Sequence, residues 1–354
     1  MDEGGAVCPL VPVFWIVREQ HSAVAMDLTN PVQFETARRS TVRRHTTQLG
    51  AWELLEPIGA GEWSTVFQAR PCGCPTDWPA DYAVKVARLD GPADACAQTL
   101  IMREATVGRR VVHPHLIAVL AAQLDTTPCY LVMPLLHGAT LQTVLAACGL
   151  LPAPQALWIV RQIAEALETL HEAGWVHADI KPGNIHVSPS GHATLIDLGF
   201  ALRRGSPECA PGGALRGTLR YTAPEMISSA VPVDERSDIY SLGITLYELL
   251  TGEPPFIDED PGRLMLAHLQ RPVPNPRRRL PGLHHGVYAL LRGMLAKEPL
   301  RRPSAAELIR QLVTLEIATL AERGAAPGVG GSIEYADQSV DNHVGDVQCG
   351  CGGR

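Results

Sequence analysis

The sequence lacks a long hydrophobic run. No stretch approaches the roughly 20 apolar residues that a membrane-spanning helix needs. The apolar run at 7–17 follows an acidic start, whereas a secretory signal has a basic one. We therefore expect a cytoplasmic protein without a membrane anchor.

An excess of basic residues is also missing. Lysine and arginine total 30, against 37 aspartates and glutamates, which gives a net charge of −7. The charges are spread along the chain. Electrostatics therefore give no reason to expect a nucleic acid or an anionic membrane as a partner.

A disulfide framework is not apparent either. The nine cysteines are an odd number, and most lie singly, which favours a reducing compartment. Two pairs have C-x-C spacing, Cys72 with Cys74 and Cys349 with Cys351. They could form a metal or redox site or be a coincidence of two loops, because structural zinc usually takes a longer spacing.

The length and composition are those of a globular protein with two domains or two lobes. The chain has 354 residues, of which 46% are hydrophobic and 19% charged. Residues 1–50 are polar and irregular, with a basic cluster at 37–45, and predict a solvated, disordered arm. A docking or regulatory segment is the alternative.

Alternating and helical patterns divide the rest of the chain. Short apolar runs at 52–61 and 62–70 predict a hairpin with a glycine-rich turn, followed by strands at 82–89, 116–124 and 128–136 and a helix at 95–111. Helical spacing then predominates, at 153–174, 237–252, 286–296 and 304–323. We predict an α+β fold with a small β-rich N-lobe (about 51–136), a helical C-lobe (about 137–320) and a flexible tail (321–354).

Glycine and lysine indicate a phosphate-binding site in the first lobe. Gly59 and Gly61 would let backbone N–H groups approach phosphate oxygens, although this signal alone is weak. Lys85 emerges from an apolar strand, where an ammonium is costly to bury unless an anion meets it. Glu104, on the following helix, could pair with Lys85 or be an ordinary surface glutamate.

The segment HADIKPGN, at 177–184, carries the groups that phosphoryl transfer needs. Asp179 can accept the proton of an attacking hydroxyl, and Lys181 can neutralise charge on the transferred group. Asn184, together with Asp197 further along, offers the hard oxygen ligands that Mg²⁺ prefers.

These motifs, in this order, resemble the eukaryotic-type (Hanks-type) serine/threonine protein kinase family over roughly 52–320. The series continues with RGTLRYTAPE (216–225), DERSDIYSLGITLYELLTGEPPF (234–256) and KEPLRRPSAAE (297–307). The compact loops resemble the bacterial branch. The resemblance implies a two-lobed kinase that transfers the γ-phosphate of ATP to serine or threonine hydroxyls of proteins.

The resemblance also implies roles for individual residues. Catalysis would use Asp179 as the base, with Lys181, Lys85 and Glu104, and Mg²⁺ (or Mn²⁺) would bind Asn184 and Asp197. Gly217 and Thr218 would belong to the activation and substrate segment, and Glu225, Asp238 and Arg302 would be structural. ATP would contact Ile58, Gly59, Ala60, Gly61, Glu62, Trp63, Ser64, Thr65, Val66, Ala83, Lys85, Met133, Pro134, Leu136 and His186.

Five positions depart from the family pattern. Two changes are mild, since Ser64 replaces a glycine with a small side chain and Leu198 replaces a phenylalanine with another apolar residue. Ala178 replaces an arginine that in many kinases binds an activation-loop phosphate, which suggests an enzyme that does not need this phosphorylation. Gly108 stands where an apolar residue usually packs the 95–111 helix, and predicts a gap there. His186 replaces the leucine that usually underlies adenine, and predicts a neutral ring stacked on the base or a pH-sensitive site.

Three functions are compatible with these motifs. A protein kinase accounts for all six groups with a chemical role. A pseudokinase or scaffold usually loses at least one of them, and small-molecule kinases of related fold generally lack the GT…APE segment present here. Protein substrates are therefore the expected partners, with a regulatory partner binding through the N- or C-terminal tail.

Overall fold

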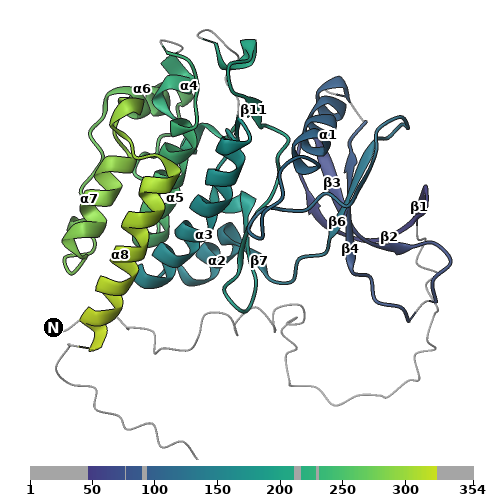
Figure 1. The fold of residues 1–354 in the computed structure, drawn as a ribbon, viewed down its shortest axis with the longest axis horizontal. Helices are drawn as coiled ribbons and strands as arrows, with labels where there is room; N and C mark the ends of the chain where they lie inside the picture. Colours follow the sequence, from purple (N-terminus) through teal and green to yellow (C-terminus); the bar gives the residue numbers. More distant parts are fainter. Residues whose placement is uncertain (1–46, 76, 90–93, 211–216, 229–230, 325–354) are drawn as a thin grey trace, which may run out of the picture.

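The computed structural model describes residues 47–75, 77–89, 94–210, 217–228 and 231–324. A twisted sheet with one helix forms one lobe, and a larger bundle of helices forms the other (Figure 1). The predicted α+β fold with two lobes is confirmed.

A six-stranded antiparallel sheet forms the N-lobe, in the order β1-β2-β3-β4-β6-β5. The glycine-rich turn joins β2 to β3, as predicted. The elements are β1 (Thr47–Leu49), β2 (Trp52–Ala60), β3 (Ser64–Pro71), β4 (Tyr82–Ala87), α1 (Asp94–Gly108), β5 (Ala121–Gln123) and β6 (Tyr130–Pro134).

Side-chain alternation along β4 and β6 places Lys85 on the face of the sheet that α1 covers. Val84 and Val132 pack into the apolar cluster on one side of the sheet, whereas Leu131 packs with Ile101 of α1 on the other. Lys85 lies opposite Leu131 in the β4–β6 ladder. Because successive strand residues point to opposite faces, the lysine faces α1.

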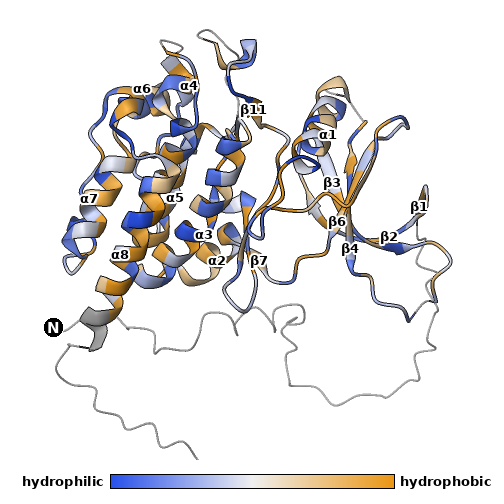
Figure 2. Cartoon of the chain, in the orientation of Figure 1, coloured by the Kyte–Doolittle hydropathy of each residue, from blue (hydrophilic) through white to orange (hydrophobic). Residues whose placement is uncertain are grey.

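The C-lobe is built around α3, α5 and α8. Every residue of α5 from Ser237 to Tyr247 is buried, which confirms the predicted buried helix. Both apolar and polar residues occur along these helices (Figure 2). The helices are α2 (Leu141–Cys148), α3 (Ala153–Glu172), α4 (Pro224–Ser228), α5 (Arg236–Thr251), α6 (Pro261–Gln270), α7 (His285–Met294) and α8 (Ala305–Gly324).

Short strands and 3₁₀ turns connect these helices. The strands are β7 (Ala139–Thr140), β8 (Trp175–Val176), β9 (Ile185–Val187), β10 (Ala193–Leu195) and β11 (Leu202–Arg203). The turns are η2 (Pro182–Asn184), η3 (Pro207–Cys209), η4 (Leu219–Tyr221), η5 (Pro276–Arg278) and η6 (Pro299–Arg301).

Several predicted boundaries were wrong. The strand expected at 116–124 is a strand only at β5, the helix expected at 95–111 ends at Gly108, and the strand expected at 82–89 ends at Ala87. Thr47–Leu49 pairs with β2, so the sheet begins within the expected arm. Helix α8 continues to Gly324, past the expected end of the lobe at 320. The rest of the arm and of the tail lies outside the described residues.

The gap predicted at Gly108 is also wrong. A Cβ atom at Gly108 would lie 2.4 Å from Cγ2 of Val119, far inside van der Waals contact. Val119 packs against the apolar cluster beneath α1 and occupies the space that a larger side chain would need. The glycine therefore permits close packing at the end of this helix.

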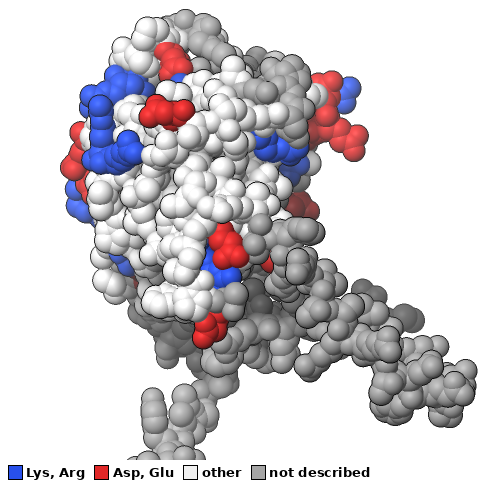
Figure 3. Space-filling view, turned by 90° about the vertical axis from the view of Figure 1, so that its right-hand side faces the viewer, with Lys and Arg blue, Asp and Glu red and all other residues white. Residues whose placement is uncertain are grey.

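None of the helices in the described part of the chain combines the length and apolar character that crossing a bilayer requires. Figure 3 shows the face on the side of the N-lobe, where acidic and basic side chains both occur and uncharged residues form most of the described surface. This face agrees with the mixed charge of the sequence.

Candidate active site

Three charged side chains from three elements meet between the lobes. Lys85 Nζ lies 2.6 Å from Glu104 Oε2 of α1 and 2.9 Å from Asp197 Oδ1. Lys85 and Glu104 are both buried, at 8% and 1% exposure. The structure thus brings together the predicted lysine, its helix partner and the predicted metal ligand. The alternative of a surface glutamate at position 104 was wrong.

Burial and mutual attraction shift the pKa values of this cluster. Burial alone would lower the pKa of Lys85, but the carboxylates of Asp197 and Glu104 raise it above its ordinary value. Burial tends to raise the pKa of Asp197, and the ammonium of Lys85 outweighs this and lowers it. Lys85 is therefore a fixed cation that faces the cleft at neutral pH.

The carboxylate of Asp179 is held by four hydrogen bonds. Oδ2 accepts from Lys181 Nζ at 2.7 Å and from Asn184 Nδ2 at 2.8 Å. Oδ1 accepts from the backbone N–H of Thr218 at 2.9 Å and from its hydroxyl at 3.1 Å. Because both oxygens are bonded, the orientation of this buried group is fixed before any substrate arrives.

Gly217 lets its own backbone, next to Thr218, approach Asp179 closely. Its φ of +78° lies in the left-handed region, and a Cβ there would lie 2.7 Å from the carbonyl oxygen of Ala178 and 3.1 Å from Oδ1 of Asp179. Thr218 Oγ1 also accepts from Lys181 Nζ at 2.6 Å. The predicted pair Gly217–Thr218 therefore joins the predicted Asp179–Lys181 pair.

The donor set at Asn184 and Asp197 fits a hard divalent cation. Asn184 donates both of its recorded bonds through Nδ2, to the backbone oxygen and the carboxylate of Asp179, so its oxygen remains for a metal. Asp197 uses Oδ1 for Lys85 and for the N–H of Gly199 at 3.2 Å. Two oxygen donors suit Mg²⁺, which keeps phosphates and water in its shell.

Asp238 supports the loop from below. Its carboxylate is fully buried and accepts from the backbone N–H groups of His177 and Ala178 and from Nε2 of His171, each at 2.8 Å. These bonds hold Ala178 in a left-handed conformation, with φ of 64°, directly before Asp179. The predicted structural role of Asp238 thus has a visible basis.

The glycine-rich turn does not need its glycines for packing. A Cβ at Gly59 or Gly61 would meet only ordinary van der Waals contact, at 3.9 and 3.7 Å, and neither residue has positive φ. Arg88 holds the turn through the carbonyls of Gly61 and Trp63. The fold alone therefore leaves these glycines unexplained, whereas a ligand that approaches the backbone would explain them.

An apolar cluster lies beside this turn, mostly on N-lobe residues. Ala83 and Met133 are buried in it, and Val66 and Leu136 pack against it, together with Ile117, Leu135 and Ile196. Four predicted adenine contacts thus come together. Ile58 does not join this cluster and is 51% exposed.

His186 lies in β9, between Thr140 of β7 and Thr194 of β10. The ring is partly buried, and burial, with a smaller contribution from His137, lowers its pKa below the ordinary value. The ring is therefore neutral at neutral pH, and its stacking on adenine stays a prediction.

A cleft of about 330 Å³ unites the charged groups. Its lining includes Gly61, Lys85, Glu104, Asp179, Lys181, Asn184, Asp197 and Thr218, all predicted. The sequence analysis missed Ala97, Leu100, Ile101 and Phe200. The first three lie seven, four and three positions before Glu104, so helical spacing from Glu104 could have found them.

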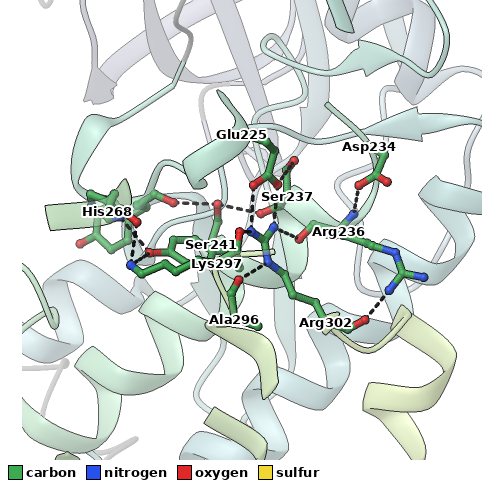
Figure 4. Close-up of polar contacts among 11 residues, drawn as sticks. Glu225, Asp234, Arg236, Ser237, Ser241, His268, Ala296, Lys297 and Arg302 are labelled. Carbon is green, nitrogen blue, oxygen red and sulfur yellow. Dashed lines mark hydrogen bonds and ion pairs between the residues drawn. The ribbon is translucent and has the colours of Figure 1, made fainter. Parts of the chain in front are cut away.

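A second buried network lies deeper in the C-lobe (Figure 4). Arg302 pairs with both carboxylate oxygens of Glu225, at 2.6 and 2.8 Å, and Ser237 donates to the same carboxylate at 2.6 Å. The predicted structural pair is therefore present. It ties the end of the activation segment to the segment that precedes α8.

One of the two C-x-C pairs, Cys72 with Cys74, lies in the described residues. Cys72 and Cys74 are free thiols, and the described residues contain no group of three or more His, Cys, Asp or Glu side chains placed to hold a metal. Cys349 and Cys351 lie outside the described residues.

A lobe built on a sheet, a helical lobe and a charged cleft are the architecture of a protein kinase domain. Residues 52–313 match the model of the protein kinase domain, and the chain belongs to this family. Members of the family generally use ATP and a divalent metal ion.

The relatives of the chain are bacterial serine/threonine-protein kinases. It is 36% identical over 269 residues to PknB of Mycobacterium leprae, which covers 74% of this chain and 42% of the relative. The corresponding values are 33% over 263 residues for PknH of Mycobacterium bovis (74% and 43%) and 34% over 256 residues for PknE of Mycobacterium tuberculosis (72% and 44%). The chain spans less than half the length of each of these relatives.

Proposed function

We propose that the chain is an active serine/threonine protein kinase that transfers the γ-phosphate of ATP to protein hydroxyls. The observation that carries the proposal is the carboxylate of Asp179, oriented by four hydrogen bonds at the edge of the cleft that contains Lys85 and Asp197. The test is ATP-dependent labelling of a generic protein such as casein, with Asp179→Asn as the comparison.

Each charged group has a part in the proposed transfer. The hydroxyl of the substrate gives its proton to Asp179 as its oxygen bonds to the γ-phosphorus, and the bond to the β-phosphate oxygen breaks to release ADP. Lys85 holds the α- and β-phosphates, and Glu104 fixes the lysine. Lys181 lies beside Asp179 and offsets negative charge on the transferred group.

Asn184 and Asp197 would hold the metal ion. When bound, Mg²⁺ would offset the charge of the phosphates. The apolar cluster of Ala83, Met133, Val66 and Leu136 would take the adenine, with the carbonyl of Pro134 and the N–H of Leu136 as its hydrogen-bonding groups. The remaining turn residues, Ala60, Glu62, Ser64 and Thr65, would cover the phosphates. The cytoplasmic location and the binding of a regulatory partner through the tails stay predictions.

We also propose that activity does not depend on phosphorylation of the activation segment. Ala178 has only a methyl side chain, so it cannot pair with a phosphate. Thr218 uses its hydroxyl for Asp179 and Lys181, and a phosphate there would break both bonds. Thr222 is 4% exposed and donates to the carbonyl of Thr218.

Phosphatase treatment checks this independence. We expect the dephosphorylated enzyme to keep its kcat within about two-fold of the autophosphorylated enzyme. Ala178 cannot bind a phosphate, and Lys181, the basic residue of the loop, already pairs with Asp179. Mass spectrometry would confirm the phosphorylation state at Ser206, Thr218 and Thr222. A large gain in kcat upon phosphorylation at any of the three would refute the proposal.

Replacing His186 with leucine should leave the pH profile of ATP binding unchanged above pH 7. Burial lowers the pKa of the histidine, so the ring is already neutral there, and its protonation opposes folding only as the pH falls through the ordinary range near 6.5. Fluorescence titration with an ATP analogue at pH 7.0 and 8.5 measures this. The ratio of the two proteins' Kd values should be the same at both pH values, and a change of several-fold would show that the ring titrates in the site.

A further inference from the structure

Arg103 of α1 forms an ion pair with Glu208 of the activation segment. Arg103 Nη2 lies 2.7 Å from Glu208 Oε1, between residues 105 positions apart. The arginine side chain is 14% exposed and the glutamate 35%. The other terminal nitrogen of Arg103 is buried and has no hydrogen-bond partner among the described residues. The carboxylate of Glu208 therefore accepts a hydrogen bond from a guanidinium that is largely buried.

Glu208 lies in a turn with a fixed backbone. Its neighbour Cys209 is 2% exposed, and the thiol donates to the carbonyl of Arg203. The backbone N–H of Cys209 donates to Ser206, and its carbonyl accepts from Val233, both near 3 Å. The carboxylate is thus presented to α1 from η3, a turn bonded on both sides to the C-lobe.

The position of Arg103 connects this pair to the catalytic ion pair. Arg103 directly precedes Glu104, which holds Lys85 at 2.6 Å. On the same helix, Leu100 lies against Gly199, where an added Cβ would be 3.3 Å from Cβ of Leu100. A force that keeps α1 against the C-lobe at Arg103 therefore also keeps Glu104 within reach of Lys85.

We propose that Glu208 is a built-in anion that positions α1 through Arg103, in the role that an activation-segment phosphate has elsewhere. Phosphorylation orders such segments by giving arginine a charge to bind, and a glutamate supplies charge without modification. The inference rests on the proposed kinase function. It explains how the enzyme could be active without phosphorylation of its activation segment. Glu208 and Arg103 are positioning residues, since neither lines the cleft.

Steady-state kinetics of Glu208→Gln test the proposal. The amide keeps the shape of the side chain and removes its charge. We therefore expect kcat to fall about five-fold and the KM for ATP to rise. A five-fold change is the effect expected from the loss of one partly exposed ion pair. The KM for the protein substrate should not change, because the pair acts through Glu104 on Lys85, which would hold the phosphates of ATP. Arg103→Gln should act alike, and the double variant should be no worse than either single one.

Glu235→Gln is the matched control. Glu235 pairs with Arg204 of the activation segment at 3.2 Å. This ion pair also joins the activation segment to the C-lobe, but it does not involve α1. We expect wild-type kinetics from it. Glu208→Asp, which keeps the charge on a shorter side chain, should recover part of the lost kcat. A purely structural role would instead lower the melting temperature and leave the kinetics of the folded enzyme unchanged.

Hydrogen exchange provides a readout that does not need activity. Amides of α1 should exchange faster in Glu208→Gln, while those of α3 and α5 should match the wild type. Unchanged exchange in α1 together with unchanged kcat would overturn the inference and leave the proposed function intact. A wild-type protein that cannot phosphorylate any protein would overturn the proposed function, while the exchange data would still decide the role of the pair.

Discussion

Asp179→Asn will reduce phosphoryl transfer by about 10²- to 10⁴-fold, the range that a positioned general base contributes. The carboxylate takes the proton of the hydroxyl, which a carboxamide does not. An amide would also place an N–H₂ group against donors, since Oδ1 and Oδ2 each accept two hydrogen bonds in the native protein. The geometry of Lys181 and Thr218 would be disturbed as well.

Two measurements separate lost chemistry from lost binding. Radiolabel transfer to casein gives kcat, and fluorescence titration gives the affinity for an ATP analogue. We expect affinity within a few-fold of wild type, because Lys85 and the apolar cluster remain. Asp125→Asn is the control, since Asp125 is exposed and does not line the cleft. Full activity in Asp179→Asn would exclude the proposed base. Absence of transfer in the wild type would favour a pseudokinase or scaffold.

The sequence predicted which charged groups meet in the cleft because each lies in a short motif. Lys85 follows an apolar strand, and Asp179, Lys181 and Asn184 occupy one eight-residue loop. A helix next to a strand made the pairing of Glu104 with Lys85 one of two alternatives, and the structure decides between them. Such local patterns can be read from the sequence without knowledge of the packing, and the long helices were predicted for the same reason.

Packing decides the features that the sequence could not predict. Gly108 indicated a gap, but the fold places Val119 against it. The strands β7, β8 and β11 have two residues each, too few for an alternating pattern. The pair of Arg103 and Glu208 joins distant positions, and many exposed glutamates resemble Glu208 in sequence. Only the fold shows that η3 brings this one to α1.

Arg302→Met should be the most destabilising of the proposed variants. All five N–H groups of Arg302 are used: two bond Glu225, and the others donate to the carbonyls of Ala296, Arg236 and Lys297 (Figure 4). The side chain is completely buried. Methionine fills part of the volume but leaves a buried carboxylate and three carbonyls without these donors. We expect a loss of about 3–5 kcal/mol in the free energy of unfolding.

The neighbouring residue provides a matched control. Arg301 pairs with Glu298 at 2.7 Å, but the side chains are 73% and 67% exposed. Water solvates the carboxylate of Glu298 once the arginine is removed. Arg301→Met should therefore cost less than about 1 kcal/mol in the free energy of unfolding. Thermal unfolding followed by circular dichroism should place Arg302→Met roughly 10 °C below wild type and Arg301→Met near it. Equal melting temperatures for the two variants would mean that burial of the Glu225–Arg302 pair does not determine its contribution to stability.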